Sequence, residues 1–190
     1  MIYTCETVLP VGKTTLASDG ENLIGLWIEK QKYFAGAILN QAREEKDLPV
    51  FTQTRKWLDA YFSGENPRIS DLPLAPRGNA FRQRVWEILR AVPKGQTRTY
   101  GAIAKQIAQE TGGKMSAQAV GNAVGHNPIS IIIPCHRVVK RDGEVSSAFA
   151  FGGANRQVEL LKAEGVGFLD DSHVDMKHCC VRALPLILDE

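Results

Sequence analysis

The sequence lacks a long apolar run, a leader pattern and a large net charge. No stretch approaches the roughly 18 apolar residues that a membrane-spanning helix needs, so we expect no membrane contact. The chain begins Met1-Ile2-Tyr3-Thr4-Cys5, without the basic and apolar segments of a secretion signal. The spacing of its four cysteines suggests no disulfide framework. We therefore expect a cytoplasmic protein with free thiols.

The net charge is small, but the charged residues are unevenly placed. The net charge is +2, yet residues 77–140 hold ten Lys and Arg against two acidic residues, and the remainder holds 13 basic and 19 acidic residues. A basic half on a nearly neutral chain is typical of a nucleic-acid-binding surface. A solubilising surface with chance asymmetry explains the charges equally well.

Prolines at 67, 73 and 76 interrupt regular structure and suggest a boundary there. We expect an α/β fold with a small N-terminal α/β domain (1–72), a mostly helical C-terminal domain (73–169) and an irregular, loosely held tail (170–190). The hydrophobic patterns predict three strands followed by two helices in the first domain. These elements are Ile2–Val8, Thr14–Ser18, Leu23–Ile28, Phe34–Glu45 and Thr54–Phe62.

The pattern then becomes helical. Apolar stripes predict helices from about Phe81 and from Tyr100, and Ser116 can cap a third helix that ends near Val124. The β-branched run Ile129–Ile133 predicts a buried strand, and Asn155–Glu164 predicts a last helix. Two helices joined through glycines inside the basic segment are similar to a helix-turn-helix. Most such helix pairs bind nothing, so this signal alone is weak.

The segment Pro134-Cys135-His136-Arg137 carries the candidate chemistry. A thiolate is a strong nucleophile, and it needs a base or a positive neighbour to form near neutral pH. Adjacent residues of an extended chain point to opposite sides, so the thiol and the imidazole meet only through a turn or a water. On these residues alone, a buried structural cysteine beside a satisfied histidine is the more common explanation.

The wider context adds a resemblance. Pro134-Cys135-His136-Arg137-Val138-Val139, with Asn127-Pro128 before it and Leu160–Gly165 after it, resembles the O6-alkylguanine-DNA alkyltransferase family. The resemblance spans about residues 1–168. It implies a ribonuclease-H-like first domain and a helix-turn-helix in the second. It also implies a monomer that needs no cofactor and moves the alkyl group of O6-alkylguanine, or of O4-alkylthymine, in double-stranded DNA to Cys135 once.

The resemblance also implies roles for individual residues. Cys135 would be the nucleophile, His136 would act through a water as its base, and Glu164 would hold the second imidazole nitrogen. Asn127 would order the turn before the cysteine, and Tyr100 would donate a proton to the departing guanine oxygen. Without the family, these last three residues are a surface acid, a turn residue and a core aromatic.

Because the reacting atom lies inside a stacked duplex, the nucleotide would be flipped out through the minor groove by the helix after Ser116. The implied DNA contacts are Ser116, Ala117, Gln118, Ala119 and Gly121. The implied pocket residues are Val124, Val138, Phe149 and Ala150.

The chain departs from the family pattern in three places. Gln118 stands where relatives commonly carry an arginine that fills the gap left by the flipped base. The pocket loop Ala148–Gly153 is altered, with about two extra residues between Gly143 and Leu160, and Phe149 lacks a tyrosine hydroxyl. Cys5 stands alone, so we expect no zinc in the first domain. A metal site from His173, His178, Cys179 and Cys180 is disfavoured by their spacing.

Two other functions stay open at this point. A lesion-recognition protein without transfer activity would fit the altered pocket loop, although Cys135 argues against it. A cysteine hydrolase could use Cys135, His136 and Glu164 as a triad. The intact mass of the protein after exposure to methylated DNA separates the three functions.

Overall fold

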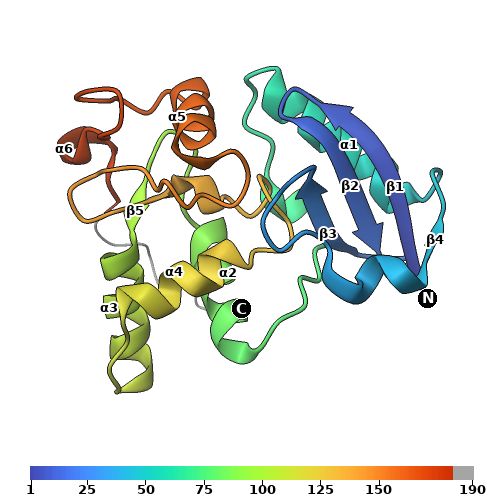
Figure 1. The fold of residues 1–190 in the computed structure, drawn as a ribbon, viewed down its shortest axis with the longest axis horizontal. Helices are drawn as coiled ribbons and strands as arrows, with labels where there is room; N and C mark the ends of the chain where they lie inside the picture. Colours follow the sequence, from blue (N-terminus) through green and yellow to red (C-terminus); the bar gives the residue numbers. More distant parts are fainter. Residues whose placement is uncertain (182–190) are drawn as a thin grey trace.

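The computed structural model describes residues 1–181, apart from the side chains of residues 36 and 37. A sheet half and a helical half lie side by side (Figure 1). The strands are β1 (Ile2–Leu9), β2 (Gly12–Ser18), β3 (Leu23–Ile28), β4 (Ala42–Glu44), β5 (Arg98–Thr99) and β6 (Val138–Val139). The helices are α1 (Pro49–Phe62), α2 (Ala80–Arg90), α3 (Tyr100–Thr111), α4 (Ala117–Gly125), α5 (Gly153–Ala163) and α6 (Met176–Cys179). No helix of this described part is long and apolar enough to cross a membrane.

The first half is a four-stranded sheet with the order β3-β2-β1-β4. β1 pairs with β2 and β2 with β3 in antiparallel fashion, whereas β4 joins β1 in parallel. α1 packs on β2 and β3, and every residue of β3 is buried. The helix begins five residues earlier than expected because Pro49 occupies its first turn, where a missing N–H costs nothing. The predicted α/β class is confirmed.

The predicted helix Phe34–Glu45 is wrong. A short 3-10 helix (Gly36–Gln41) is followed directly by β4. Tyr33 and Ala35 have φ values of 60° and 45°, which no right-handed helix accepts. Ala42 then pairs with Ile2 at the edge of the sheet. Pairing between distant segments therefore overrides the local helical pattern here.

The second half is helical, and side chains cap the starts of α2, α3 and α4. Thr99 caps α3, and Ser116 caps α4 by accepting a hydrogen bond from the Ala119 amide at 3.1 Å, as predicted. α3 ends at Thr111 and is capped by Gly112, which has a φ of 68°, and α4 begins five residues after this glycine. α2, α3 and α4 pack against one another, which gives the expected helix-turn-helix arrangement.

The predicted strand Ile129–Ile133 is a buried turn instead. The Ile132 amide donates to Ser130 and the Ile133 amide to Ile129, so most of its backbone bonds are local. Ile131 has a φ of 71°, which a strand residue does not adopt. One strand-like contact exists, because Leu26 of β3 exchanges backbone hydrogen bonds with Pro128 and Ser130. A short apolar run marks burial, and it does not fix the backbone shape.

The predicted loosely held tail is also wrong for residues 170–181. α6 lies here, Val174 is fully buried, and the backbone of residues 179–181 bonds to Thr97 on both sides. Residues 182–190 of that predicted tail lie outside the described residues. The buried contacts hold the segment against the helical half, beside β5 (Figure 1).

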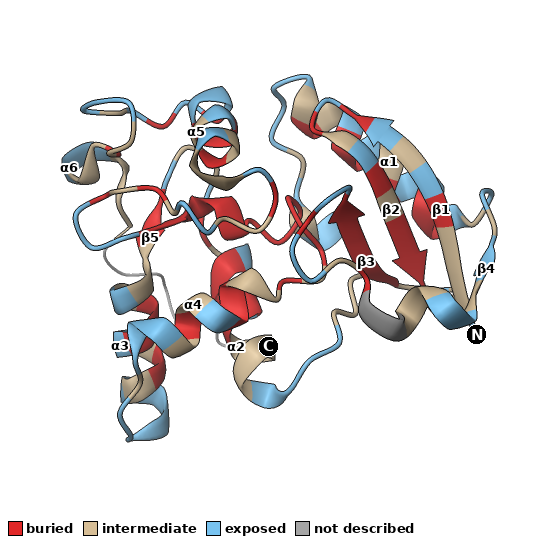
Figure 2. Ribbon diagram, in the orientation of Figure 1, coloured by how far each residue is buried: buried red, intermediate tan, exposed pale blue. Residues whose placement is uncertain are grey.

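One apolar cluster joins the two halves (Figure 2). It includes Leu26 of the sheet, Phe51 of α1, Trp86 of α2 and Ile103 of α3, all essentially inaccessible to solvent. The division into residues 1–72 and 73–169 therefore stays a prediction about the chain, because the interior is continuous across it.

Candidate active site

Cys135 lies at the floor of a cavity of about 410 Å³. The residue follows the buried isoleucine turn and begins a 3-10 turn, Cys135–Arg137. Only 3% of it is exposed. The cavity is lined by Tyr100, Ala117, Gln118, Gly121, Val124, Gly125, Cys135, Ser146, Ala148, Phe149 and Ala150. The turn gives Cys135 and His136 different directions, because the thiol lines the cavity and the imidazole lies behind it.

Two opposing influences act on the Cys135 thiol. Burial dominates and raises its pKa to about 11. Hydrogen bonds from the Asn127 side chain and from the Ile131, Cys135 and His136 backbone act in the opposite direction. Asn127 is itself fixed, because its amide donates to the Ile133 carbonyl at 2.7 Å and its oxygen accepts from the Ile129 amide. The sulfur is thus surrounded by donors that favour a thiolate once a base removes the proton.

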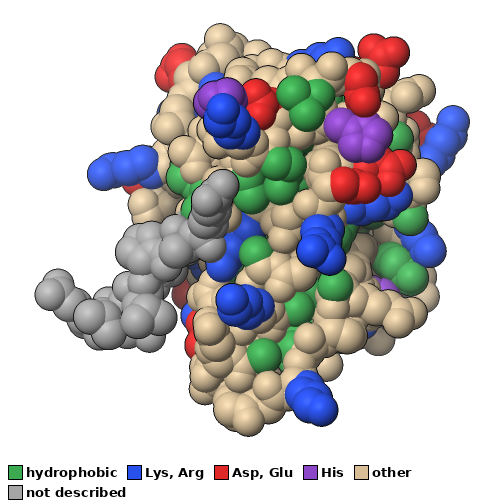
Figure 3. Space-filling view, turned by 90° about the vertical axis from the view of Figure 1, so that its left-hand side faces the viewer, with side chains coloured by type: hydrophobic (Ala, Val, Ile, Leu, Met, Phe, Trp, Pro, Cys, Tyr) green, Lys and Arg blue, Asp and Glu red, His purple; other side chains and the backbone are tan. Residues whose placement is uncertain are grey.

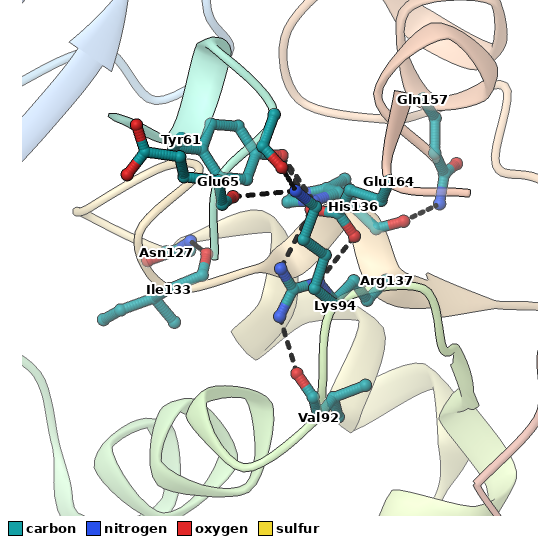
Figure 4. A network of polar contacts seen from close by, with 11 residues as sticks. Tyr61, Glu65, Val92, Lys94, Asn127, Ile133, His136, Arg137, Gln157 and Glu164 are labelled. Carbon is teal, nitrogen blue, oxygen red and sulfur yellow. Dashed lines mark hydrogen bonds and ion pairs between the residues drawn. The ribbon is translucent and has the colours of Figure 1, made fainter. Parts of the chain in front are cut away.

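A buried polar network is centred on His136, the residue that follows Cys135 (Figure 4). His136 Nε2 is 2.7 Å from Glu164 Oε1, and neither side chain is more than 1% exposed. The carboxylate therefore faces Nε2–H, which leaves Nδ1 with the lone pair of the neutral ring. Nδ1 is buried and has no hydrogen-bond partner among residues 1–181. This is the arrangement of a base held by a carboxylate.

Arg137 holds the same carboxylate from the other side. Its Nε donates to Glu164 Oε2 at 2.8 Å, and its Nη2 donates to Oε1 at 2.9 Å. Its Nη1 donates to the Val92 carbonyl at 2.6 Å. Burial alone would raise the pKa of Glu164, but His136 and Arg137 outweigh burial and hold the pKa far below its usual range. Glu164 is therefore a charged anchor rather than an acid.

Tyr100 begins α3 and lines the cavity wall. Its ring lies over Gly121 of α4, where a side-chain carbon would come within 3.8 Å of the ring. Burial raises the pKa of Tyr100 to about 12, while a hydrogen bond with the Ser146 side chain acts in the opposite direction. The hydroxyl therefore stays protonated at neutral pH and can act as a donor.

The predicted DNA contacts lie on the start of α4, at the rim of the cavity. Ser116, Ala117 and Gln118 are exposed, and Ala119 and Gly121 are half-buried. Ala117, Gln118 and Gly121 also line the cavity. The helix thus presents small side chains and the amides of Gln118 and Asn122 to the outside. It presents no charge there.

Three of the four predicted pocket residues line the cavity. Val124, Phe149 and Ala150 line the cavity as expected. Val138 does not: it is fully buried behind Cys135, and its carbonyl accepts a hydrogen bond from Gln157 Nε2 at 2.8 Å. A carbonyl oxygen can accept two hydrogen bonds, so a role for Val138 in binding the base stays a prediction.

Sequence reasoning missed four residues of the site. Arg137 belongs to the cysteine motif but was given no role. Ser146 and Gln157 follow it in the region where the chain departs from the family pattern. Tyr61, on α1 of the sheet half, donates to Glu164 Oε1 at 2.7 Å across 103 residues of sequence. Nothing local marks Tyr61, because its helix reads as an ordinary amphipathic element.

Basic side chains of residues 77–140 contribute less surface charge than their number suggests. Arg98 and Arg137 are almost fully buried, and Arg84 forms ion pairs with Glu87 and Glu110. On the end of the molecule shown in Figure 3, Lys and Arg side chains are spread singly over the surface. In residues 1–181, no three His, Cys, Asp or Glu side chains are grouped as metal ligands. His173 and His178 instead bond to Asp170 and Asp175.

Two family models match the chain in succession. The ribonuclease-like domain of 6-O-methylguanine DNA methyltransferase matches residues 2–76, and the DNA binding domain of the same family matches residues 80–166. Together the two matched segments take up most of the chain.

Individual proteins agree with this match. The methylated-DNA–protein-cysteine methyltransferase of Haemophilus influenzae is 38% identical over 161 residues, 85% of this chain and 85% of that protein. The protein of the same name from Mycobacterium bovis is 41% identical over 86% of this chain and 93% of its own length. The crystal structure of Mycobacterium tuberculosis OGT in complex with DNA aligns with a TM-score of 0.73 at 37% identity, covering 86% of this chain and 93% of that one.

Proposed function

The chain belongs to the 6-O-methylguanine DNA methyltransferase family, and from that premise we propose that it repairs alkylated DNA by moving the alkyl group from guanine O6 to Cys135. The observation that carries the proposal is Cys135 at the floor of a cavity, with the His136–Glu164 pair directly behind it. O4-alkylthymine is a second substrate of the same chemistry.

The first step activates the thiol. With a pKa of about 11, roughly one Cys135 in ten thousand would be ionised at pH 7 without help. A water between Sγ and His136 Nδ1 passes the proton to the imidazole, whose Nε2–H stays on Glu164. Donors from Asn127 and the turn backbone then hold the thiolate. His136 therefore acts as a general base in a water-poor site.

The second step is an in-line displacement. The thiolate attacks the alkyl carbon, a carbon–sulfur bond forms, and the carbon–oxygen bond breaks with its electron pair going to O6. Tyr100 donates its proton toward the departing oxygen, and the proton on His136 replaces it through solvent. Atoms and charges balance without a cofactor. A thioether is not hydrolysed under these conditions, so each chain reacts once.

The DNA would reach this cavity with the damaged nucleotide flipped out of the stack. We assign the minor-groove contact to α4, through Ser116, Ala117, Gln118, Ala119 and Gly121. Small side chains on the exposed edge of α4 support a close approach of the groove. In the cavity, Val124, Phe149 and Ala150 would flank the base.

The protein would act as a monomer, because all residues of the proposed reaction come from one chain. We place it in the cytoplasm, where a reducing environment suits Cys5, Cys135 and Cys179, which are thiols in the structure. Duplex DNA is its only proposed partner.

The test is the intact mass of the protein after incubation with a duplex that contains O6-methylguanine. We expect the mass of one methyl group per chain, mapped to Cys135 by peptide digestion. The Cys135→Ala variant should gain no mass yet still bind the lesion, because the groove contacts do not involve the thiol. Several turnovers per chain, or a methyl group on Cys5 or Cys179, would refute the proposal.

A further inference from the structure

We propose that Tyr61, on α1 of the sheet half, is a positioning residue of the transfer site, where its hydroxyl holds Glu164 and thereby orients the His136 ring. This inference rests on the proposed function. It makes the sheet half a contributor to the chemistry, in addition to its packing role.

The geometry around Glu164 carries the inference (Figure 4). Oε1 accepts three hydrogen bonds: from the Tyr61 hydroxyl at 2.7 Å, from His136 Nε2 at 2.7 Å and from Arg137 Nη2 at 2.9 Å. The Tyr61 oxygen also lies 3.4 Å from His136 Nε2. Three donors on one oxygen fix the direction from which each approaches, so the tyrosine restricts the position of the imidazole.

Tyr61 is seated firmly enough to do this. Its ring stacks on Trp57 with centroids 5.6 Å apart, and Phe62 meets it edge-on at 5.1 Å. The end of α1 is pinned by Lys94, whose ammonium donates to the Gly64 and Glu65 carbonyls at 2.6 and 2.7 Å. Lys94 lies two residues after Val92, whose carbonyl accepts a hydrogen bond from Arg137. The loop after α2 therefore contacts both the end of α1 and the arginine that binds Glu164.

The hydroxyl always faces the carboxylate as a donor. Burial, and then the charge and hydrogen bond of Glu164, raise the pKa of Tyr61 far above its usual range. A buried carboxylate would accept that donor in place of water. A purely structural role would need only the ring, which a phenylalanine could replace.

The donor has a predictable electrical effect. The charged and titratable groups in contact with His136 are Glu164 and Tyr61, and Arg137 shares the same carboxylate oxygen. A hydrogen bond to Oε1 spreads the carboxylate charge and so weakens its pull on a protonated imidazole. Without the hydroxyl, the imidazolium is favoured more strongly. On acidification of such a variant, the His136 ring would therefore stop acting as a base at a higher pH.

The experiment follows single-turnover transfer from free O6-benzylguanine, a small substrate that removes DNA binding from the rate, at a series of pH values. For Tyr61→Phe we expect the acid limb of the profile to move to higher pH. We also expect the plateau rate to fall about threefold to tenfold, the scale of one oriented hydrogen bond. An unchanged profile and plateau would overturn the inference.

Trp57→Phe is the matched control on the same helix. It removes a ring stacked on Tyr61 and the hydrogen bond from the indole to the Arg68 carbonyl, but it touches neither Glu164 nor His136. Its acid limb should coincide with that of the wild type. An equal shift in this variant would assign the effect to packing and refute a role for the hydroxyl.

A second variant keeps the test open if Tyr61→Phe does not fold. 3-Fluorotyrosine placed at position 61 keeps the ring and makes the hydroxyl a stronger donor, so the acid limb should move to lower pH. A shift to higher pH, or none, would contradict the inference. If the wild type takes no methyl group from O6-methylguanine DNA, the proposed function fails. If it reacts with that DNA but not with the free benzylated base, the same pH series is measured with saturating methylated duplex. If the wild type transfers the alkyl group and Tyr61→Phe has the same pH profile and plateau rate, only the role of Tyr61 is refuted.

Discussion

At the residue scale, Glu164 combines a charge with full burial. It neutralises Arg137 and orients His136, and its side chain is 1% exposed. Sequence position suggested a solvated acid at the end of α5. The buried donors to its carboxylate come from α1 and from the cysteine turn, so only the folded chain reveals the full environment.

Replacing Glu164 with Gln should therefore cost both activity and stability. The amide offers one acceptor oxygen, so Arg137 becomes a buried charge without compensation. We expect a loss of about 3–5 kcal/mol in the free energy of unfolding at pH 7. Urea unfolding measures it. Glu159→Gln, on the exposed side of the same helix, removes only a surface ion pair with Arg156, worth about 1 kcal/mol or less.

The loss of stability caused by Glu164→Gln should depend on pH. Because the folded pKa of Glu164 lies far below the ordinary 4.5, its charge stabilises the fold fully above that value. This stabilisation is lost as the pH falls from 4.5 toward the folded pKa. The gap in stability between wild type and Glu164→Gln should narrow on acidification. A gap that is the same at pH 7 and pH 3 would show that the carboxylate charge is not the cause.

At the element scale, α4 carries the departure that affects DNA binding most directly. Gln118 is exposed at the cavity rim, where an arginine would add a charge near the phosphates and a longer plug for the vacated stack. Gln118→Arg should tighten DNA binding by about 1 kcal/mol, the difference between a charge-assisted and a neutral hydrogen bond. The saturated transfer rate should stay nearly unchanged.

Stopped-flow transfer rates against DNA concentration measure both quantities. Gln118→Ala should act in the opposite direction and slow flipping, since it removes the amide that can bond to the unpaired base. If both variants show the apparent affinity of the wild type, Gln118 is not the residue that fills the gap, and the assigned register of α4 is wrong.

The segment after β3 is a second element with a definite energetic role. Gln31 is 5% exposed, and its Oε1 accepts from the Ile28 amide at 3.1 Å and from the Ser130 hydroxyl at 3.0 Å. It thus ties the sheet half to the isoleucine turn that carries Cys135. Gln31→Ala leaves two buried donors unpaired and should destabilise the protein by about 1–3 kcal/mol.

Urea unfolding of Gln31→Ala tests this tie. Gln53→Ala is the matched control, because Gln53 is an exposed glutamine of α1 that makes a single hydrogen bond to the Asp71 carbonyl. The urea concentration at which half of Gln53→Ala is unfolded should lie near that of the wild type. Equal losses in the two variants would mean that the contact with Ser130 contributes little.

Elements were predictable where local physics decides them. Ser116 was identified as a cap because a hydroxyl before an apolar helix accepts a free amide, and the structure has that bond. Ile129–Ile133 failed because an apolar run records burial without recording backbone shape. The cysteine motif predicted Cys135 as the nucleophile, and the structure places it on the cavity. Tyr61 and Gln157 reach the site from other elements and have no local signal.

At the scale of the whole molecule, the uneven charge gives a quantitative expectation. Of the ten basic residues between 77 and 140, Arg98 and Arg137 are buried, and Arg84 and Lys140 are paired with acids, which leaves at most about six for phosphate contacts. Each phosphate contact adds about −0.9 to the slope of log K against log salt, so we expect a slope no steeper than about −6. Equilibrium binding to undamaged duplex at several salt concentrations measures it, and a flat response would exclude this region as the footprint.

The hydrogen bonds between Leu26 and residues 128 and 130 have a consequence for synthesis. The ribosome releases β3 about a hundred residues before its partner exists, an interval of about 5–20 s at ordinary elongation rates. Through that interval the nascent sheet exposes an apolar edge strand, the kind of surface to which chaperones and other chains adhere. The contact that joins the two halves in the finished molecule thus makes its first half dependent on protection while the second is being made.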